Sequence, residues 1–211
     1  MTHKICIFGA SGATGLELTR QALERGYEVT AFVRSQTAKE KLPRGVTVLV
    51  GNLLDRTDVE RAIAGNQAVI IAIGPRIASQ EIFCAAATQN IIEAMRSSGV
   101  RRLICQTGAM IGEYPHLSWF MRSMKDAYQK QQPVLANDRL EQEQRVAASG
   151  LDWTLVKPPR LTNGPARGRV RSGERLNIGA MSSISRLDLS RFILDQVGSQ
   201  EYIGKSVAVR Y

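Results

Sequence analysis

Three glycines spaced three residues apart, Gly9, Gly12 and Gly15, are the residues whose pattern most clearly suggests chemistry. Four apolar residues, Ile5 to Phe8, directly precede them, and a helical pattern of apolar residues follows. This order predicts a buried strand, a tight turn and a helix N-terminus, whose free amides and dipole bind anions. Glycine lets the backbone approach a phosphate closely or adopt a positive φ. We predict that a dinucleotide pyrophosphate binds to the seven loop residues Gly9, Ala10, Ser11, Gly12, Ala13, Thr14 and Gly15.

The end of the second predicted strand indicates which dinucleotide is bound. Residues 27–33 end at Arg34 and Ser35, and neither position is acidic. An acidic residue here binds the ribose 2′-hydroxyl of NAD, whereas an arginine accommodates the 2′-phosphate of NADP. The guanidinium of Arg34 and the hydroxyl of Ser35 suit a phosphate, so we predict that NADPH is preferred over NADH. We expect Lys39 and Lys41, which follow, to be solvated charges instead of ligands.

Strands and helices alternate along the chain and must position these residues. The predicted strands cover residues 5–8, 27–33, 46–50, 68–73, 102–106 and 153–156. The predicted helices cover residues 16–25, 58–64, 79–98 and 135–149. This alternation predicts an α/β fold with a doubly wound parallel sheet, the Rossmann arrangement. We expect a single domain over residues 1–211 with a small substrate-binding elaboration.

The carboxyl ends of the strands should supply the rest of the site, because ligands bind across that edge of such a sheet. We assign to the cofactor the residues at these ends that are small, polar or next to a glycine: Asn52, Leu53, Ile73, Gly74, Arg76, Gln106, Thr107 and Pro158. The last strand ends in the segment Lys157 to Arg160. Each segment alone could be an ordinary loop, and its glycines could be turn formers, but together they favour a binding site.

Composition narrows the classes of partner. Of the 211 residues, 44% are hydrophobic and 22% are charged, which is typical of a soluble globular protein. Without an apolar leader or a membrane-length apolar run, we expect a cytoplasmic protein that contacts no membrane. The net charge of +9 is spread along the chain and favours small anionic ligands over nucleic acid. Three scattered cysteines and two histidines predict no metal site. We expect a monomer or a small homo-oligomer.

The chain resembles the divergent short-chain dehydrogenases/reductases of the NAD(P)H-binding subgroup that includes biliverdin-IXβ reductase, also called flavin reductase. The resemblance covers nearly the whole chain. The matched residues are 9–15, 26–30 with 33–34, 68–70 with 74–76, and 149–152 with 158–159. The resemblance implies NADPH along the strand ends, with Arg34 and Arg76 on the side of the adenosine phosphate. It also implies that the nicotinamide lies near Thr107–Gly108 and Pro158–Pro159, and that flavins or open tetrapyrroles are substrates.

Three departures from that family concern catalysis. The family's serine after the fifth strand falls at Gly108, which leaves Thr107 as the nearest hydroxyl and our catalytic candidate. The family's histidine falls at Arg160, which could anchor an anionic substrate or be a solvated arginine after a proline turn. The Y-x-x-x-K pair of the wider superfamily is missing, because Gln132 follows Tyr128 at the lysine position. We expect an enzyme that positions hydride donor and acceptor, with solvent or a nearby donor supplying the proton.

Relative to that reductase, the chain carries extra residues between the fifth and sixth predicted strands. They lie in the segment 114–132, whose residues 115–125 mix large apolar and cationic side chains. We predict that this segment is a substrate lid in which Trp119 contacts the substrate; the alternative is an amphipathic helix packed on the core. Ser185 to Asp188 predicts a capping box for a helix that runs through Ile193. The function that we expect is NADPH-dependent reduction of a conjugated acceptor: a flavin, a biliverdin-like tetrapyrrole or a quinone. The alternative is a redox-sensing regulator that binds NADP(H) without turnover.

Overall fold

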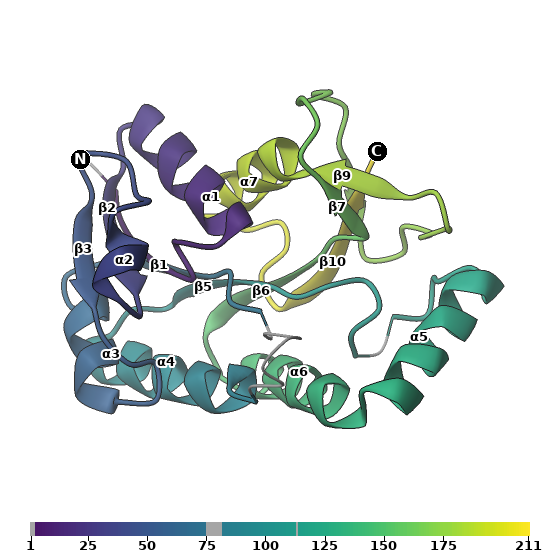
Figure 1. The fold of residues 1–211 in the computed structure, drawn as a ribbon, viewed down its shortest axis with the longest axis horizontal. Helices are drawn as coiled ribbons and strands as arrows, with labels where there is room; N and C mark the ends of the chain where they lie inside the picture. Colours follow the sequence, from purple (N-terminus) through teal and green to yellow (C-terminus); the bar gives the residue numbers. More distant parts are fainter. Residues whose placement is uncertain (1–2, 75–81, 113) are drawn as a thin grey trace.

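One mostly parallel sheet forms the centre of the protein (Figure 1). The computed structural model describes residues 3–74, 82–112 and 114–211, and within them the sheet order is β3-β2-β1-β4-β5-β6-β10-β8. Only the pairing of β10 with β8 is antiparallel in this sheet. Its strands are β1 (Lys4–Phe8), β2 (Glu28–Val33), β3 (Thr47–Val50), β4 (Ala68–Ile71), β5 (Arg102–Gln106), β6 (Asp152–Lys157), β8 (Arg171–Gly173) and β10 (Lys205–Arg210). A small parallel sheet pairs β7 (Arg160–Thr162) with β9 (Ser183–Ser185).

Helices cover both faces of the sheet, which confirms the predicted doubly wound α/β fold in a single domain (Figure 1). The helices are α1 (Ala13–Glu24), α2 (Gln36–Lys39), α3 (Arg56–Ile63), α4 (Cys84–Ser98), α5 (Trp119–Gln131), α6 (Pro133–Ala147) and α7 (Arg186–Asp195). On one face α1 and α7 pack on the sheet through Leu18 and Leu189. On the other face α3, α4 and α6 pack through Val59, Ile91 and Val146. None of the described helices could span a bilayer.

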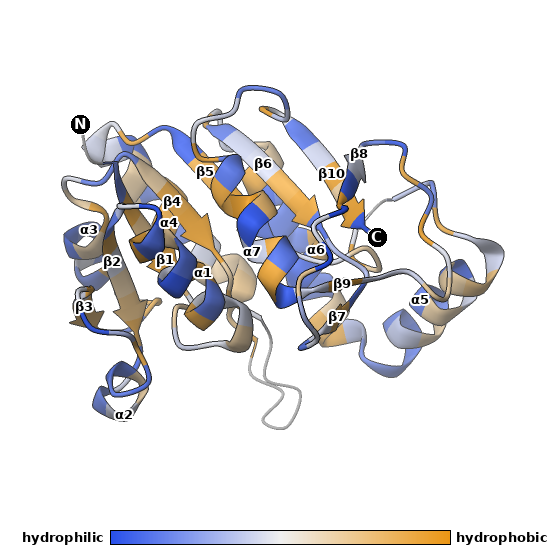
Figure 2. Cartoon of the chain, turned by 90° about the horizontal axis from the view of Figure 1, so that it is seen from above, coloured by the Kyte–Doolittle hydropathy of each residue, from blue (hydrophilic) through white to orange (hydrophobic). Residues whose placement is uncertain are grey.

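The central strands are apolar along their length because both of their faces are covered. Every residue of β4 and the last four of β1 are buried, and these segments are orange in Figure 2. In the sheet, β1 lies between β2 and β4. From β1 the chain first adds β2 and β3 on one side and then crosses to β4 on the other, so the strand order reverses between β1 and β4. A ligand crevice is expected at the carboxyl ends of strands where the order reverses. The loop after β1 lies at this point.

The helix boundaries differ from the prediction where side chains cap the helix ends. α3 begins at Arg56 instead of residue 58, because the Asp55 carboxylate accepts from the amides of Thr57 and Asp58. α6 begins at Pro133 instead of residue 135, since proline suits the first helical position. α4 begins at Cys84, and residues 79–81 of the predicted helix lie outside the described residues.

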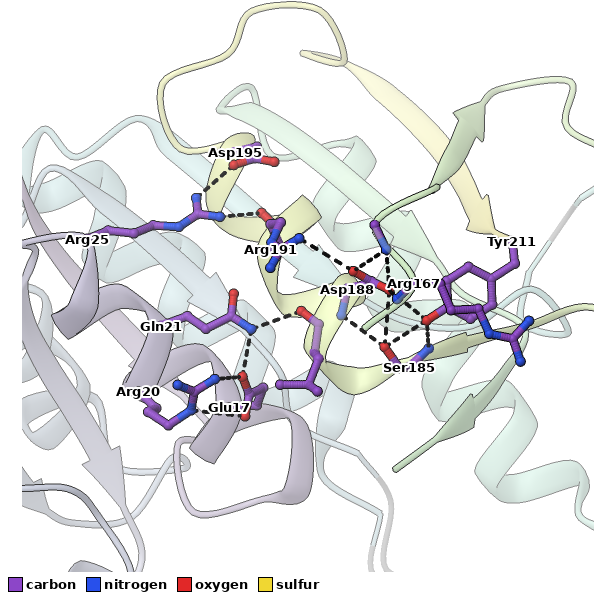
Figure 3. Close-up of polar contacts among 12 residues, drawn as sticks. Glu17, Arg20, Gln21, Arg25, Arg167, Ser185, Asp188, Arg191, Asp195 and Tyr211 are labelled. Carbon is purple, nitrogen blue, oxygen red and sulfur yellow. Dashed lines mark hydrogen bonds and ion pairs between the residues drawn. The ribbon is translucent and has the colours of Figure 1, made fainter. Parts of the chain in front are cut away.

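The C-terminal third of the chain contains elements that the sequence did not predict. β10 and β8 extend the sheet beyond β6, and β7 and β9 form the second sheet. The predicted helix start at Ser185 is confirmed, because its hydroxyl accepts from the Asp188 amide. The Asp188 carboxylate does not complete the capping box. It binds the Arg167 amide and the Tyr211 hydroxyl, at 2.6 and 2.7 Å, and so ties the end of the chain to α7 (Figure 3).

Candidate functional site

The glycine loop has the geometry that a phosphate-binding turn requires. Gly9 has a φ of +84°, and a Cβ there would lie 2.6 Å from the carbonyl oxygen of Ala72. A Cβ on Gly15 would lie 2.0 Å from the carbonyl oxygen of Gly9. Gly12 is the N-cap of α1 and offers no side chain to its first amides, and the first turn holds no acidic residue. The helix therefore presents free amides and its positive end to an anion.

A cleft of about 500 Å³ opens beside this loop, along the carboxyl ends of β1, β2, β3 and β4. It brings together predicted cofactor residues from four strand ends: Gly9, Ser11, Gly12, Arg34, Ser35, Asn52, Leu53, Ile73 and Gly74. Four other loop residues, Ala10, Ala13, Thr14 and Gly15, lie beside it without lining it; Ala10 is in the core and Ala13 begins α1. Arg76 lies outside the described residues.

The far end of the cleft is positively charged. Arg34 is exposed at the end of β2, and Lys41, which is exposed as expected, also lines the cleft. Ser35 accepts a bond from the Ala38 amide at 3.2 Å and so caps α2. No carboxylate lines this cleft in the part of the chain that the structure describes. A phosphate would find cations and a hydroxyl here, with no like charge to oppose it.

Side chains beneath the cleft fix the strand ends that line it. Asp58 accepts the Asn52 amide at 2.9 Å, and Asn90 donates to the Leu53 carbonyl at 3.0 Å. A Cβ on Gly51 would lie 2.6 Å from Asp58, so this strand end sits directly on the carboxylate. The side chain of Asp138 caps α4 through the amide of Cys84 at 3.0 Å. These contacts fix the backbone segments that line the cleft.

The carboxyl ends of β5 and β6 form a second, buried part of the site. The Thr107 amide donates to the Val156 carbonyl, and the Ala109 amide donates to the Pro158 carbonyl, each at 2.9 Å. Thr107 and Pro158 are buried, as is the side-chain oxygen of Gln106, which has no hydrogen-bond partner among the described residues. Gln106, Thr107 and Pro158 do not line the 500 Å³ cleft. Their assignment to the cofactor remains a prediction.

A buried ion pair stands directly behind Thr107. The Thr107 hydroxyl donates to Oε1 of Glu143 at 2.6 Å, and Nζ of Lys157 lies 2.7 Å from Oε2 of the same carboxylate. The side chains of Lys157 and Glu143 are 1% and 7% exposed. Burial lowers the pKa of the Lys157 ammonium, although Glu143 opposes the shift. The sequence placed Lys157 at a strand end without a role and missed Glu143, whose position in α6 carries no motif.

Arg139 is a second buried cation that the sequence did not single out. Its guanidinium donates to the carbonyl of Ile73 at 3.1 Å and to that of Gln106 at 3.4 Å. It is 4% exposed. Arg139 therefore clamps the ends of two neighbouring strands, β4 and β5, against α6.

The two predicted substrate residues lie on separate elements. Arg160 is exposed at the start of β7, and Trp119 is 80% exposed at the start of α5. Segment 114–132 is largely helical, but only Met121 of α5 is buried. The helix therefore packs on the core through very little of its surface. Tyr114 anchors the segment by donating to the Leu176 carbonyl at 2.6 Å. The lid remains a prediction.

Known proteins resemble the chain in sequence and in fold. The family described as NAD(P)H-binding matches residues 9–200. An NAD(P)H azoreductase from Xenophilus azovorans is 29% identical over 73% of this chain and 47% of its own length. The chain spans about half the length of the curated relatives that it matches.

Two solved structures show how widely the fold is shared. An anaerobillin reductase from Escherichia coli O157:H7 has a TM-score of 0.80 at 20% identity, over 98% of this chain and 96% of its own. A short-chain dehydrogenase/reductase from Veillonella parvula, in complex with NADP, has a TM-score of 0.79 at 18% identity, over 99% of this chain and 94% of its own. At these identities the likeness shows the fold alone.

Proposed function

Because this chain belongs to the NAD(P)H-binding family, we propose that it is a reductase that uses NADPH in preference to NADH. The observation that carries the cofactor preference is the cationic end of the cleft. Arg34 and Lys41 line the cleft there, and no carboxylate of the described residues lines it. The glycine loop fits a pyrophosphate, because Gly9 and Gly12 line the cleft without side chains at the N-terminus of α1. When bound, NADPH supplies hydride.

We propose that the acceptor is a conjugated molecule: a flavin, a biliverdin-like tetrapyrrole or a quinone. The azoreductase relative adds azo compounds to this class. Thr107 lies at the strand ends where the reacting groups would meet, and Arg160 would hold an anionic acceptor. The reduced, buried cysteines suit a cytoplasmic enzyme.

Titration with the two cofactors tests the preference. Arg34→Ala should weaken NADPH binding by about 1.5–3 kcal/mol, the range for a hydrogen bond to a charged group, and leave NADH binding nearly unchanged. Lys39→Ala is the matched control, because Lys39 carries the same charge nearby but does not line the cleft. Equal affinity of the unmodified protein for NADPH and NADH would refute the preference.

Turnover decides between an enzyme and a redox sensor. NADPH consumption would be followed with FMN, biliverdin, a quinone and an azo dye, each with an enzyme-free blank. An enzyme should reach a kcat of about 1 s⁻¹ or more with its acceptor class. Tight NADPH binding without turnover on any acceptor would favour the regulator and refute the reductase.

A further inference from the structure

We propose that Lys157, Glu143 and Thr107 form a proton relay that delivers a proton to the acceptor after hydride transfer. The inference rests on the proposed reductase function and names the proton donor that it needs. The three groups are consecutive: Nζ of Lys157 lies 2.7 Å from Oε2 of Glu143, and Oε1 of Glu143 lies 2.6 Å from the Thr107 hydroxyl. Both contacts are within hydrogen-bond distance.

The chain of groups runs from the interior to the carboxyl end of β5. Lys157 is fully buried, while Thr107, 8% exposed, ends the chain beyond β5. Lys157 also donates to the Ile111 carbonyl at 2.7 Å, which holds the loop after β5 over the pair. Gly112 in this loop has a φ of +61°, and a Cβ there would lie 2.0 Å from Oε2 of Glu143. The loop thus covers the carboxylate closely, and bulk water is kept from it.

Burial favours release of the Lys157 proton, and the charged groups around it act in both directions. Glu143 and Arg139 face it from α6, Lys125 from α5, and the Cys105 thiol lies nearby on β5. Lys125 itself donates to the Gly112 carbonyl. Burial lowers the pKa of Lys157; Glu143 opposes this shift, and the two other cations add to it. Because burial is the largest of these effects, Lys157 is a better acid than a solvated lysine.

The resting hydrogen-bond direction explains why the ion pair must act before Thr107 can donate. The Thr107 hydrogen points to the Glu143 carboxylate, so it cannot also point to an acceptor. When Lys157 gives its proton to Oε2 of Glu143, a turn of the carboxyl group about its Cγ–Cδ bond brings the protonated oxygen to Thr107, where it donates to Oγ1. The Thr107 hydrogen is then free to turn toward the acceptor. Transfer of a proton inside the pair therefore switches Thr107 from a donor within the protein to a donor for the substrate.

The step balances for an acceptor with a double bond X=Y. Hydride forms the X–H bond, and the π electrons of X=Y move to Y as a lone pair. Y takes the Thr107 proton, Thr107 takes the Glu143 proton, and Lys157 is left as a neutral amine. NADPH is oxidised to NADP⁺ and X=Y is reduced to HX–YH. After product release, water returns the proton to Lys157 along the same three groups.

Two substitutions at Thr107 separate the hydroxyl from the side-chain volume. Thr107→Val removes the proton path and should lower kcat with an azo or quinone acceptor by about 10²–10⁴-fold, the range for general acid catalysis. Thr107→Ser keeps the hydroxyl and should stay within about tenfold of the unmodified protein. NADPH affinity should change little in either variant. A Thr107→Val variant with the kcat of Thr107→Ser would overturn the relay.

The double variant Glu143→Gln with Lys157→Met tests the groups that act through Thr107, without leaving either charge buried alone. It should lose kcat as Thr107→Val does, and it should lose the fall of kcat at high pH that titration of Lys157 produces. A high-pH limb that persists in this variant would overturn the assignment. Arg101→Gln with Asp152→Asn, which removes an exposed ion pair, is the control.

A measurement on the cofactor-free protein provides a readout that is independent of turnover. NMR titration of lysine side chains should show one lysine with a pKa below the rest, and its signal should disappear in Lys157→Met. A Lys157 that titrates with the solvated lysines would overturn the relay. If the unmodified protein binds NADPH but reduces no acceptor, the proposed function fails; if it turns over and the variants do too, only the relay fails.

Discussion

Two alanine substitutions in the glycine loop should separate cofactor binding from folding. Gly12 has a φ of −73°, which any residue adopts, and the nearest atom to its Cβ would be the Gly9 carbonyl oxygen at 3.2 Å. The Cβ of Gly15 would lie 2.0 Å from the same oxygen and 2.7 Å from the Cα of Ala10. Gly12→Ala therefore needs a shift of a few tenths of an ångström, whereas Gly15→Ala must displace backbone.

The expected magnitudes follow from these distances. Gly15→Ala should cost about 1–3 kcal/mol of folding free energy, as overpacking does, and about 2–4 °C in Tm for each kcal/mol. Gly12→Ala should leave Tm unchanged or slightly higher, because alanine restricts the unfolded chain. Its methyl group would occupy the place of a phosphate, so NADPH should bind at least about tenfold more weakly, or about 1.4 kcal/mol.

Thermal unfolding followed by circular dichroism and a fluorescence titration with NADPH give the two quantities. Gly198→Ala is the matched control, since a Cβ there would meet no atom within 4 Å, and it should change neither. If Gly12→Ala binds NADPH as the unmodified protein does, the phosphates lie elsewhere. If Gly15→Ala keeps the unmodified Tm, the tight loop is not a constraint of this fold.

Three further outcomes are expected. Burial opposes ionisation of Asp188, but the Tyr211 hydroxyl and two backbone amides hold the pKa below its ordinary value of 3.8, so the carboxylate stabilises the fold above that pH. In urea unfolding, the stability difference between the unmodified protein and Asp188→Asn should shrink as pH falls from about 5 to about 2; a constant difference would contradict this. Burial raises the pKa of Cys84 to about 11 and that of Cys105 to about 12, so both should resist a thiol reagent at neutral pH in the native protein and react once urea unfolds it. Trp119→Ala should raise KM for the acceptor and leave the NADPH Kd unchanged if segment 114–132 is a lid; an unchanged KM would dismiss the lid.

The cofactor half of the site could be predicted because its signals are local in the sequence. The strand, the turn and the helix start occupy residues 4–24 without interruption. Arg34 ends the next strand, so a single rule about strand ends places it in the cleft. That Lys41 also lines the cleft could not be predicted, because its place depends on how the chain turns after α2, where no sequence pattern reports the direction of a side chain.

The proton-transfer half could not be predicted, because its members meet only through tertiary packing. Thr107 and Glu143 are separated by 36 residues and lie on a strand end and a helix. Within α6, Glu143 looks like one more charge on a polar helix, and Lys157 looks like a cation that ends a strand. β10 and β8 were missed for a similar reason. β10 pairs with β6, and β8 pairs with β10, so each pairing joins segments far apart in the chain.

The position of the ion pair argues that it serves more than stability. Two charges buried together cost several kcal/mol of desolvation, and well-packed apolar residues of similar volume are often at least as stable. Most of the other ion pairs among the described residues have both side chains more than a quarter exposed, such as Lys4–Glu28 and Arg101–Asp152. The pair of Lys157 and Glu143 alone is withdrawn from water on both sides within these residues, and it lies where the ends of β5 and β6 meet a hydroxyl. A protein that only binds NADP(H) at the glycine loop has no need of this arrangement, whereas a reductase must deliver a proton for each hydride.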